Sequence, residues 1–419
     1  METYFILVYL LSYIGILATS FYVINLFLYY KKKFEVKEST EKSVTIIIPA
    51  YNEEKTIEKT IKSALSLDYP KEKLEIIVVD DGSKDNTYSI AKKFTSLKFP
   101  IVKIFTKQNG GKGTALNLGI KNSSGEIIIT MDADTYVKPD ALKKMIGYFT
   151  DKIVVCVSPS MGIYKPKNIW EKIQQIEYHM GVFLRKSFAS MNAIHVTPGA
   201  FSAYRKDFFS KHGGFDENNL TEDLELALRI QSKDYVIENS PNSVAFTNPP
   251  STFKTLLVQR KRWYMGLIKN LWNYRQLFGP KKGALGTVVL PAAVTTIILS
   301  IILTVYLIVR TLIKIKDELI LLNSINFHFK DAFELNYYVV GNYFFDLLSN
   351  KIFIITVFFI SILWYYIVFS KRKMIYNEKI KLNFFLYLVF YGFLFSFWWI
   401  VTFMYMIFNK KVVWRVENK

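Results

Sequence analysis

The first apolar run of the chain is long enough to cross a membrane. Residues 3–30 contain no charged side chain, whereas about 20 helical residues span the hydrocarbon core of a bilayer. Three lysines follow directly at positions 31–33, as is typical of a cytosolic flank. A cleaved signal peptide would begin with a basic residue and have a shorter apolar run. We therefore predict an N-terminal transmembrane helix within residues 1–35.

Residues 36–250 have the pattern of a soluble α/β domain. Apolar residues at helical spacing within residues 53–67 and 87–94 predict helices. Short apolar runs before, between and after them predict buried strands at residues 44–48, 74–79, 101–105, 126–131 and 153–158. Alternation of strands and helices predicts a mostly parallel sheet, with its ligand-binding loops at the carboxyl ends of the strands.

The last third of the chain alternates between basic and apolar segments. Residues 253–278 mix apolar and basic residues at helical spacing and include two tryptophans, a pattern typical of a helix at a membrane interface, although a solvated helix face also has it. We therefore expect interface helices at 251–283. Residues 284–419 form a predicted transmembrane region with spans at 284–309, 352–369 and 383–408.

Charge in the connections bears on orientation. The link at 371–381 has five basic residues and one acidic residue, which predicts a cytosolic position, whereas the loop at 314–350 has three basic and five acidic residues and suits the outer side. Four spans leave both termini outside, yet the tail at 409–419 is basic. The sequence leaves this conflict open, and a re-entrant or interfacial segment would remove it.

Composition narrows the class of protein. The 419 residues are 51% hydrophobic and include one cysteine, Cys156, which excludes a disordered chain, a disulfide scaffold and an all-cysteine zinc site. The 54 Lys and Arg exceed the 35 Asp and Glu, for a net charge of +19, which suits nucleic acid, an anionic membrane surface or phosphate-bearing substrates. Many basic residues flank apolar spans and none forms a groove-reading helix, so we predict a lipid bilayer and no nucleic acid as partner.

Polar clusters follow the first two predicted strands. Pro49, Tyr51 and Glu53 come after the first strand, where a tyrosine ring can stack on a base and a carboxylate can accept hydrogen bonds. The same segment also reads as a turn in which Asn52 caps a helix. Asp80 and Asp81 follow the second strand, and such a pair needs hydrogen-bond donors, a cation or solvent around it.

Two further motifs suggest phosphate chemistry. Lys112 lies in Asn109-Gly110-Gly111-Lys112-Gly113 before a predicted helix, where backbone N–H groups can approach an anion, although the motif is not a Walker A loop. Asp132 and Asp134 follow a strand two residues apart, so in an extended chain both carboxylates would face one hard cation such as Mg²⁺ or Mn²⁺. An acidic turn is the alternative.

The later motifs supply a base and an aromatic platform. Thr221 is a candidate N-cap that places Glu222 and Asp223 in the first turn of a helix, where a carboxylate is either a general base or a dipole partner. Gln259, Arg262 and Trp263 share a helical face, with a guanidinium for phosphate and an indole for a sugar.

In this order the motifs resemble the family 2 glycosyltransferases, specifically the membrane-embedded processive branch that includes cellulose, hyaluronan and poly-N-acetylglucosamine synthases. The resemblance covers residues 43–263 and the flanking spans. It implies a GT-A fold, that is, a Rossmann-like mixed and mostly parallel α/β sheet, inserted here between transmembrane helices. It also implies a UDP-sugar donor, Mg²⁺ or Mn²⁺, and inversion at the anomeric carbon.

The resemblance also assigns roles residue by residue. It implies that Asp223 is the catalytic base, with Glu222 beside it, and that Asp134 and Asp132 hold the metal. Gln259, Arg262 and Trp263 would contact the diphosphate and the acceptor. The donor-binding residues would be Pro49, Tyr51, Glu53, Asp80, Asp81, Lys112 and Asp132.

The predicted function is β-glycosyl transfer, with N-acetylglucosamine as the preferred sugar, to a growing polysaccharide at the cytosolic face of the plasma or inner membrane. The chain would be multi-pass, and the resemblance leaves room for a small membrane partner subunit. The main alternative is single transfer to a lipid acceptor of the ceramide or polyprenyl-phosphate type. A non-enzymatic membrane protein that uses its net charge of +19 to bind nucleic acid or anionic lipid is the second alternative.

Overall fold

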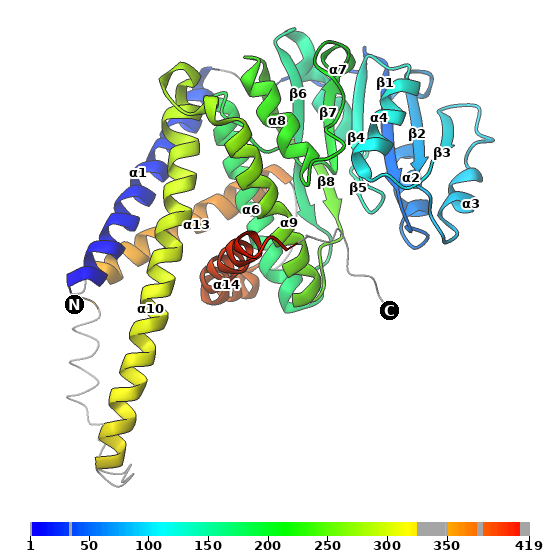
Figure 1. The fold of residues 1–419 in the computed structure, drawn as a ribbon. Helices are drawn as coiled ribbons and strands as arrows, with labels where there is room; N and C mark the ends of the chain where they lie inside the picture. Colours follow the sequence, from blue (N-terminus) through cyan, green and yellow to red (C-terminus); the bar gives the residue numbers. More distant parts are fainter. Residues whose placement is uncertain (1, 33–35, 325–347, 349–350, 375–379, 411–419) are drawn as a thin grey trace.

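The computed structural model describes residues 2–32, 36–324, 348, 351–374 and 380–410. Parts of the segments whose charge predicts orientation, at 314–350, 371–381 and 409–419, lie outside these residues. Figure 1 shows an α/β domain on one side of the molecule and long apolar helices on the other.

One eight-stranded sheet forms the centre of the domain, in the order β3-β2-β1-β4-β7-β6-β8-β5. Strands β1 to β4 are mutually parallel, β6 is parallel to β8, and β7 is antiparallel to both β4 and β6. The prediction of a mixed, mostly parallel sheet is therefore confirmed. The strands are β1 (Val44–Ala50), β2 (Leu74–Asp80), β3 (Ile101–Thr106), β4 (Ile127–Met131), β5 (Tyr136–Val137), β6 (Val154–Ile163), β7 (Phe201–Arg205) and β8 (Val236–Thr247).

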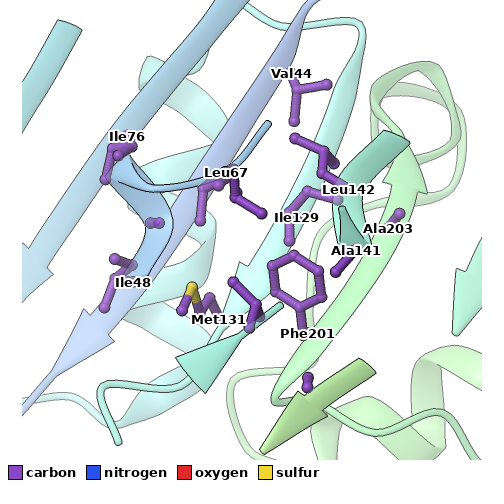
Figure 2. Packing of buried hydrophobic residues seen from close by; sticks show 14 of the residues in the cluster. Val44, Ile48, Leu67, Ile76, Ile129, Met131, Ala141, Leu142, Phe201 and Ala203 are labelled. Atoms are coloured by element: carbon purple, nitrogen blue, oxygen red, sulfur yellow. The ribbon is translucent and has the colours of Figure 1, made fainter. Parts of the chain in front are cut away.

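Helices cover both faces of this sheet, which explains why the central strands are apolar at every position. In β1, Ile46 and Ile48 belong to one hydrophobic cluster and Ile47 to a second cluster on the opposite face. Figure 2 shows part of the first cluster, where Ile129 and Met131 of β4 lie near Phe201 of β7. The covering helices are α2 (Ile57–Leu65), α3 (Thr87–Lys92), α4 (Lys112–Asn122), α5 (Ala141–Ile146), α7 (Lys206–His212) and α8 (Glu222–Ser232).

Among the residues that the structure describes, four helices are long and apolar enough to cross a membrane, at Ile6–Leu28, Leu285–Ser324, Phe353–Met374 and Lys381–Ile407. They correspond to the four predicted spans, and their length and composition indicate a membrane protein. They lie within α1 (Glu2–Lys32), α10 (Leu290–Ser324) with a preceding π-helical turn (Leu285–Val289), α13 (Lys351–Met374) and α14 (Lys381–Ile407).

Two amphipathic helices join the sheet to the apolar helices. α6 (Ile169–Ser190) contacts α1, α13 and α14 as well as β6 and β8. α9 (Phe253–Asn273) contacts α8 and α14, and both helices lie between the sheet and the apolar helices in Figure 1. The helix predicted at 253–278 therefore ends earlier than expected, at Asn273, and a 3-10 turn follows at Arg275–Leu277.

Candidate active site

The loops after β1 and β2 hold each other in place. Asn52 has a left-handed backbone, with φ of 54°, and its amide oxygen accepts a hydrogen bond from Lys84 N at 2.8 Å. Its own N–H donates to Ser83 Oγ at 2.9 Å, and Glu53 N donates to Thr87 Oγ1 at 2.7 Å. Asn52 therefore does not cap α2, whose N-cap residue is Thr56. The alternative reading of this segment as an Asn-capped helix start is wrong.

The residues predicted to bind the donor base surround this pair of loops. Pro49 lies in β1 opposite Val79, and Tyr51 is partly buried in the loop that follows. The Glu53 carboxylate accepts a hydrogen bond from Thr56 Oγ1 at 2.7 Å, so its side chain is turned toward the start of α2. Tyr51 thus lies in a loop at the carboxyl end of β1 whose next two residues are hydrogen-bonded to the segment after β2.

Asp80 and Asp81 are both buried and both hydrogen-bonded. Asp80 accepts from Thr106 Oγ1 at 3.2 Å. Asp81 pairs with Lys107 Nζ at 2.6 Å and accepts from the backbone N–H groups of Gly110 and Gly111 at 3.1 and 2.8 Å. The glycine loop was predicted to bind an anion, and the anion that it binds in this structure is the carboxylate of Asp81.

The positive φ of Gly111, +92°, lets the chain turn from this loop into α4 and directs Lys112 inward. Lys112 Nζ lies 2.6 Å from Asp132 and 3.3 Å from Glu222. Burial alone would lower the pKa of Lys112, but the carboxylates of Asp132, Glu222 and Asp223 outweigh it and raise that pKa. One cation therefore joins the ends of β4, α4 and α8.

Asp223 is the carboxylate with the most strongly altered proton affinity in this cluster. Its oxygens accept hydrogen bonds from Leu224 N at 2.8 Å and Gly199 N at 3.1 Å. Burial and the neighbouring Glu222 raise the pKa of Asp223 to about 6, against the lowering effect of Lys112 and Arg262. A carboxyl group with a pKa near neutrality is suited to accept a proton during a reaction.

Gly199 fixes the spacing of this cluster, and the sequence analysis assigned it no role. A Cβ on Gly199 would lie 2.9 Å from Lys112 Nζ and 3.0 Å from Asp223 Oδ2. A side chain at this position would force at least one of these two charged groups to shift. Its place after Pro198, in the loop before β7, was the available signal, but sequence alone does not reveal which side chains approach it.

Asp132 and Asp134 are on a turn and not on an extended strand. β4 ends at Met131, and Thr135 N donates to Asp132 O at 3.0 Å to close the turn. The geometric premise for their convergence was therefore wrong, because the backbone bends where alternation was assumed. Asp132 faces Lys112 at 2.6 Å, whereas Asp134 is 3.5 Å from Thr247 Oγ1 at the end of β8.

The described residues contain no group of three or more His, Cys, Asp or Glu side chains that could hold a metal ion. A magnesium ion bound with a nucleotide needs only one or two carboxylates, since phosphate oxygens and water complete its coordination. Asp134 is partly exposed and its hydroxyl contact is long, so its oxygens fit this type of site. Asp132 is paired with a lysine and fits it less well.

The residues predicted to bind the acceptor lie on α9, which contacts α8. Arg262 Nη1 donates to Leu220 O at 3.2 Å, and its charge lowers the pKa of Asp223. Gln259 Oε1 is buried and has no hydrogen-bond partner among the described residues. The Trp263 ring is stacked by the Arg260 guanidinium, 4.5 Å from the ring centroid. The three predicted residues thus lie on the helix that borders Asp223.

Arg260 and Glu177 are contacts that the sequence analysis missed. The buried Arg260 guanidinium makes two hydrogen bonds to Glu177, at 2.8 and 2.7 Å, which fasten α9 to α6. The motif Gln259-Arg260-Lys261-Arg262-Trp263 contains several adjacent cations. Nothing in the sequence distinguishes the structural arginine from the one beside the carboxylate.

Comparison with known sequences identifies the α/β domain. Residues 45–213 match the family described as "Glycosyl transferase family 2". The chain is 33% identical over 239 residues to the poly-beta-1,6-N-acetyl-D-glucosamine synthase of Staphylococcus epidermidis, covering 55% of this chain and 57% of that protein. It is 32% identical over 237 residues to the enzyme of the same name from Staphylococcus aureus strain COL, covering 56% and 57%. The match thus spans less than two thirds of these relatives.

Comparison with solved structures supports the same fold. A mannosyltransferase from Pyrobaculum calidifontis, solved in complex with GDP-Man and Mn²⁺, superposes with a TM-score of 0.57. The two chains are 20% identical, and the similarity covers 88% of this chain and all of that one. At this identity the likeness extends to the fold.

Proposed function

Because residues 45–213 match the model of glycosyl transferase family 2, we propose that the chain is a membrane-embedded inverting glycosyltransferase that extends a β-linked polysaccharide from a UDP-sugar. N-acetylglucosamine is the proposed sugar, since the two relatives described above carry that sugar in the names of their products. The observation that carries the proposal is the meeting of Lys112, Asp132 and Asp223 at the carboxyl end of the sheet.

Asp223 is the proposed base. The acceptor hydroxyl gives its proton to the Asp223 carboxylate as its oxygen attacks the anomeric carbon, and the bond from that carbon to the diphosphate breaks on the opposite face. A pKa near 6 leaves this carboxylate ionised at neutral pH and basic enough to take a proton. Gly199 N and Leu224 N hold its two oxygens in position, and Glu222 acts by raising its pKa.

The donor occupies the loops at the carboxyl ends of β1, β2 and β4 in this proposal. Tyr51 stacks on the uracil ring, and Pro49, Glu53, Asp80 and Asp81 shape that pocket. Lys112 and Arg262 balance the charge that develops on the departing diphosphate. Asp134, with Asp132 beside it, would hold a bound Mg²⁺ or Mn²⁺, which supplies further neutralisation of that charge.

The acceptor end lies on α9 in the same account. Trp263 offers a flat face on which a pyranose can pack, and Gln259 offers an unsatisfied amide oxygen to a hydroxyl group. The four apolar helices support a multi-pass protein of the plasma or inner membrane. The catalytic domain faces the cytosol, where nucleotide sugars are available. The proposal also includes a small membrane subunit that associates with the chain.

Transfer to a single lipid acceptor is the alternative function. The two functions differ in the size of the product, so membranes that contain the chain should be incubated with radiolabelled UDP-sugars and divalent cation. We expect label from UDP-N-acetylglucosamine in a polymer that a glycosidase degrades. Label confined to one lipid-sized species would support the alternative, and absence of transfer from every UDP-sugar would contradict both.

A further inference from the structure

Arg185, in the last third of α6, has a buried guanidinium edge without a partner. Its Nε and Nη2 make no hydrogen bond to any residue that the structure describes. Burial lowers the pKa of Arg185 to about 10, a value that still leaves it charged at neutral pH. Burying an unpaired charge costs several kcal/mol, and buried polar groups are otherwise nearly always satisfied. This edge is therefore a candidate contact for a ligand.

The two unsatisfied atoms form one recognition edge. Nε–H and Nη2–H are parallel donors on the same side of the planar guanidinium, and such a fork binds two neighbouring oxygen atoms at once. A Cβ on Gly181 would lie 3.2 Å from Nη1 and 3.6 Å from both Cζ and Nη2, so the guanidinium packs along α6 with Nη1 nearest to the helix. The missing side chain of Gly181, one turn earlier, gives the guanidinium this room.

Contacts between α6 and α9 locate this fork along the site. The rings of Trp170 and Phe253 are 5.2 Å apart, and one to two turns later Glu177 pairs with Arg260. These two contacts follow the same order along both helices, so α6 and α9 run in the same direction where their side chains meet. Gly181 is about one turn beyond Glu177, which matches the turn of α9 that carries Arg262 and Trp263.

Contacts from α6 to the sheet side agree with this position. Burial raises the pKa of Tyr178 to about 12, and the charges of both Asp134 and Arg185 also act on it, as expected for groups in the same region. Phe188, further along α6, packs in the same cluster as Leu224, the neighbour of Asp223. Arg185 thus lies between the turn of α6 that faces Asp134 and the turn that reaches the base.

The unsatisfied atoms on the two helices indicate the chemical class of the ligand. Arg185 needs hydrogen-bond acceptors, whereas the orphan oxygen of Gln259 needs a donor. Phosphate oxygens accept hydrogen bonds and cannot satisfy Gln259. Sugar hydroxyl groups both donate and accept, so one glycan satisfies both residues.

We propose that Arg185 is an acceptor-binding residue whose Nε/Nη2 fork holds two neighbouring oxygen atoms of the acceptor glycan. The inference rests on the proposed glycosyl transfer and adds a contact from α6 to the acceptor contacts of α9. It predicts that Arg185 determines how well an acceptor sugar is bound and leaves the binding of UDP unaffected.

The test uses the purified full chain in lipid nanodiscs, with UDP-N-acetylglucosamine and N-acetylglucosamine oligomers of defined length. Arg185→Met keeps the bulk of the side chain without the fork, and Arg185→Lys keeps the charge without it. Lys211→Met, which removes an exposed cation on α7, is the matched control. UDP affinity, hydrolysis of the donor by water and the KM for the oligomer are measured for each.

We expect Arg185→Met to raise the acceptor KM by about 10- to 100-fold, with UDP affinity and donor hydrolysis unchanged. The acceptor KM of Arg185→Lys should fall between those of the wild type and Arg185→Met, and the acceptor KM of Lys211→Met should match that of the wild type. A wild-type acceptor KM in either Arg185 variant would overturn the inference. Loss of UDP affinity in both would assign the fork to phosphate or to folding, and selective loss of transfer to a polyprenyl phosphate would assign it to a lipid. If the wild type transfers sugar neither to the oligomer nor to polyprenyl phosphate, the proposed function itself fails.

Discussion

At the scale of single residues, the environment of Asp223 controls the proposed chemistry. Its carboxyl group has a pKa of about 6 because burial and Glu222 oppose ionisation more strongly than Lys112 and Arg262 favour it. The proposed base must be ionised to accept a proton. We therefore predict that kcat/KM falls about tenfold per pH unit below pH 6 and is level above it. The pH–rate profile of the wild type checks this, and a level profile down to pH 4.5 would contradict it.

The same pKa predicts a cost in stability. Because the folded pKa is raised from 3.8 to about 6, the unfolded chain ionises first as the pH rises, and stability is lost between these two values. Asp223→Asn removes the penalty, so it should stabilise the fold by about 1–3 kcal/mol above pH 6 and by almost nothing near pH 4. Thermal unfolding of both proteins at several pH values measures the difference. A destabilised Asp223→Asn protein at pH 8 would be the opposite result.

Sequence identified most of the charged residues of this cluster but not their partners. The positions of Asp81, Lys112, Asp132 and Asp223 after strands or at helix starts were enough to single them out. Their pairing depends on side chains from distant segments, such as the glycine loop that binds Asp81. A residue whose role is only to be small, as Gly199 is, carries no chemistry that a pattern can reveal.

At the scale of elements, the pairing of α6 with α9 positions the acceptor side of the site. Arg260 is buried against Glu177, and a buried charge left without its partner costs about 3–5 kcal/mol. Glu177→Gln should therefore lower the melting temperature and raise the acceptor KM. The double variant Glu177→Gln/Arg260→Met should recover much of the stability, because it leaves no uncompensated charge. A double variant less stable than Glu177→Gln would show that the uncompensated charge of Arg260 is not what destabilises Glu177→Gln.

The elements were predictable where local pattern determines them. The apolar runs of β1, β2 and β4 are visible in the sequence because these strands are buried on both faces, and the four apolar helices are visible because each is long enough to span a bilayer. The apolar run of β3 is also visible, although this edge strand is only partly buried. β7 and β8 were not predicted. β7 pairs with β4 and β8 pairs with β6, so each pairing joins segments that are far apart in the sequence. β8 also contains polar residues such as Asn239 and Ser240, whose side chains are buried and hydrogen-bonded inside the domain. α6 was missed because its polar residues, among them Gln174 and Lys186, are buried against other helices and strands.

At the scale of the whole molecule, the domain comes between the first and second apolar helices in the sequence, and in space it lies to one side of both (Figure 1). A cytosolic domain follows from the proposal and can be tested with cysteine labelling. The native Cys156 is buried, so a cysteine introduced at the exposed Lys59 would be the reactive one. We predict that a membrane-impermeant maleimide labels Lys59→Cys in inverted vesicles and not in intact cells. Labelling of intact cells would place the domain outside.

The central claim is that one site, formed around Lys112, Asp132 and Asp223, transfers a sugar from a nucleotide. The most direct measurement compares UDP binding and sugar transfer in the purified wild type and in Asp223→Asn. The account predicts that both proteins bind UDP equally and that only the wild type transfers N-acetylglucosamine from UDP-N-acetylglucosamine to an acceptor. Transfer by Asp223→Asn at the wild-type rate would contradict it.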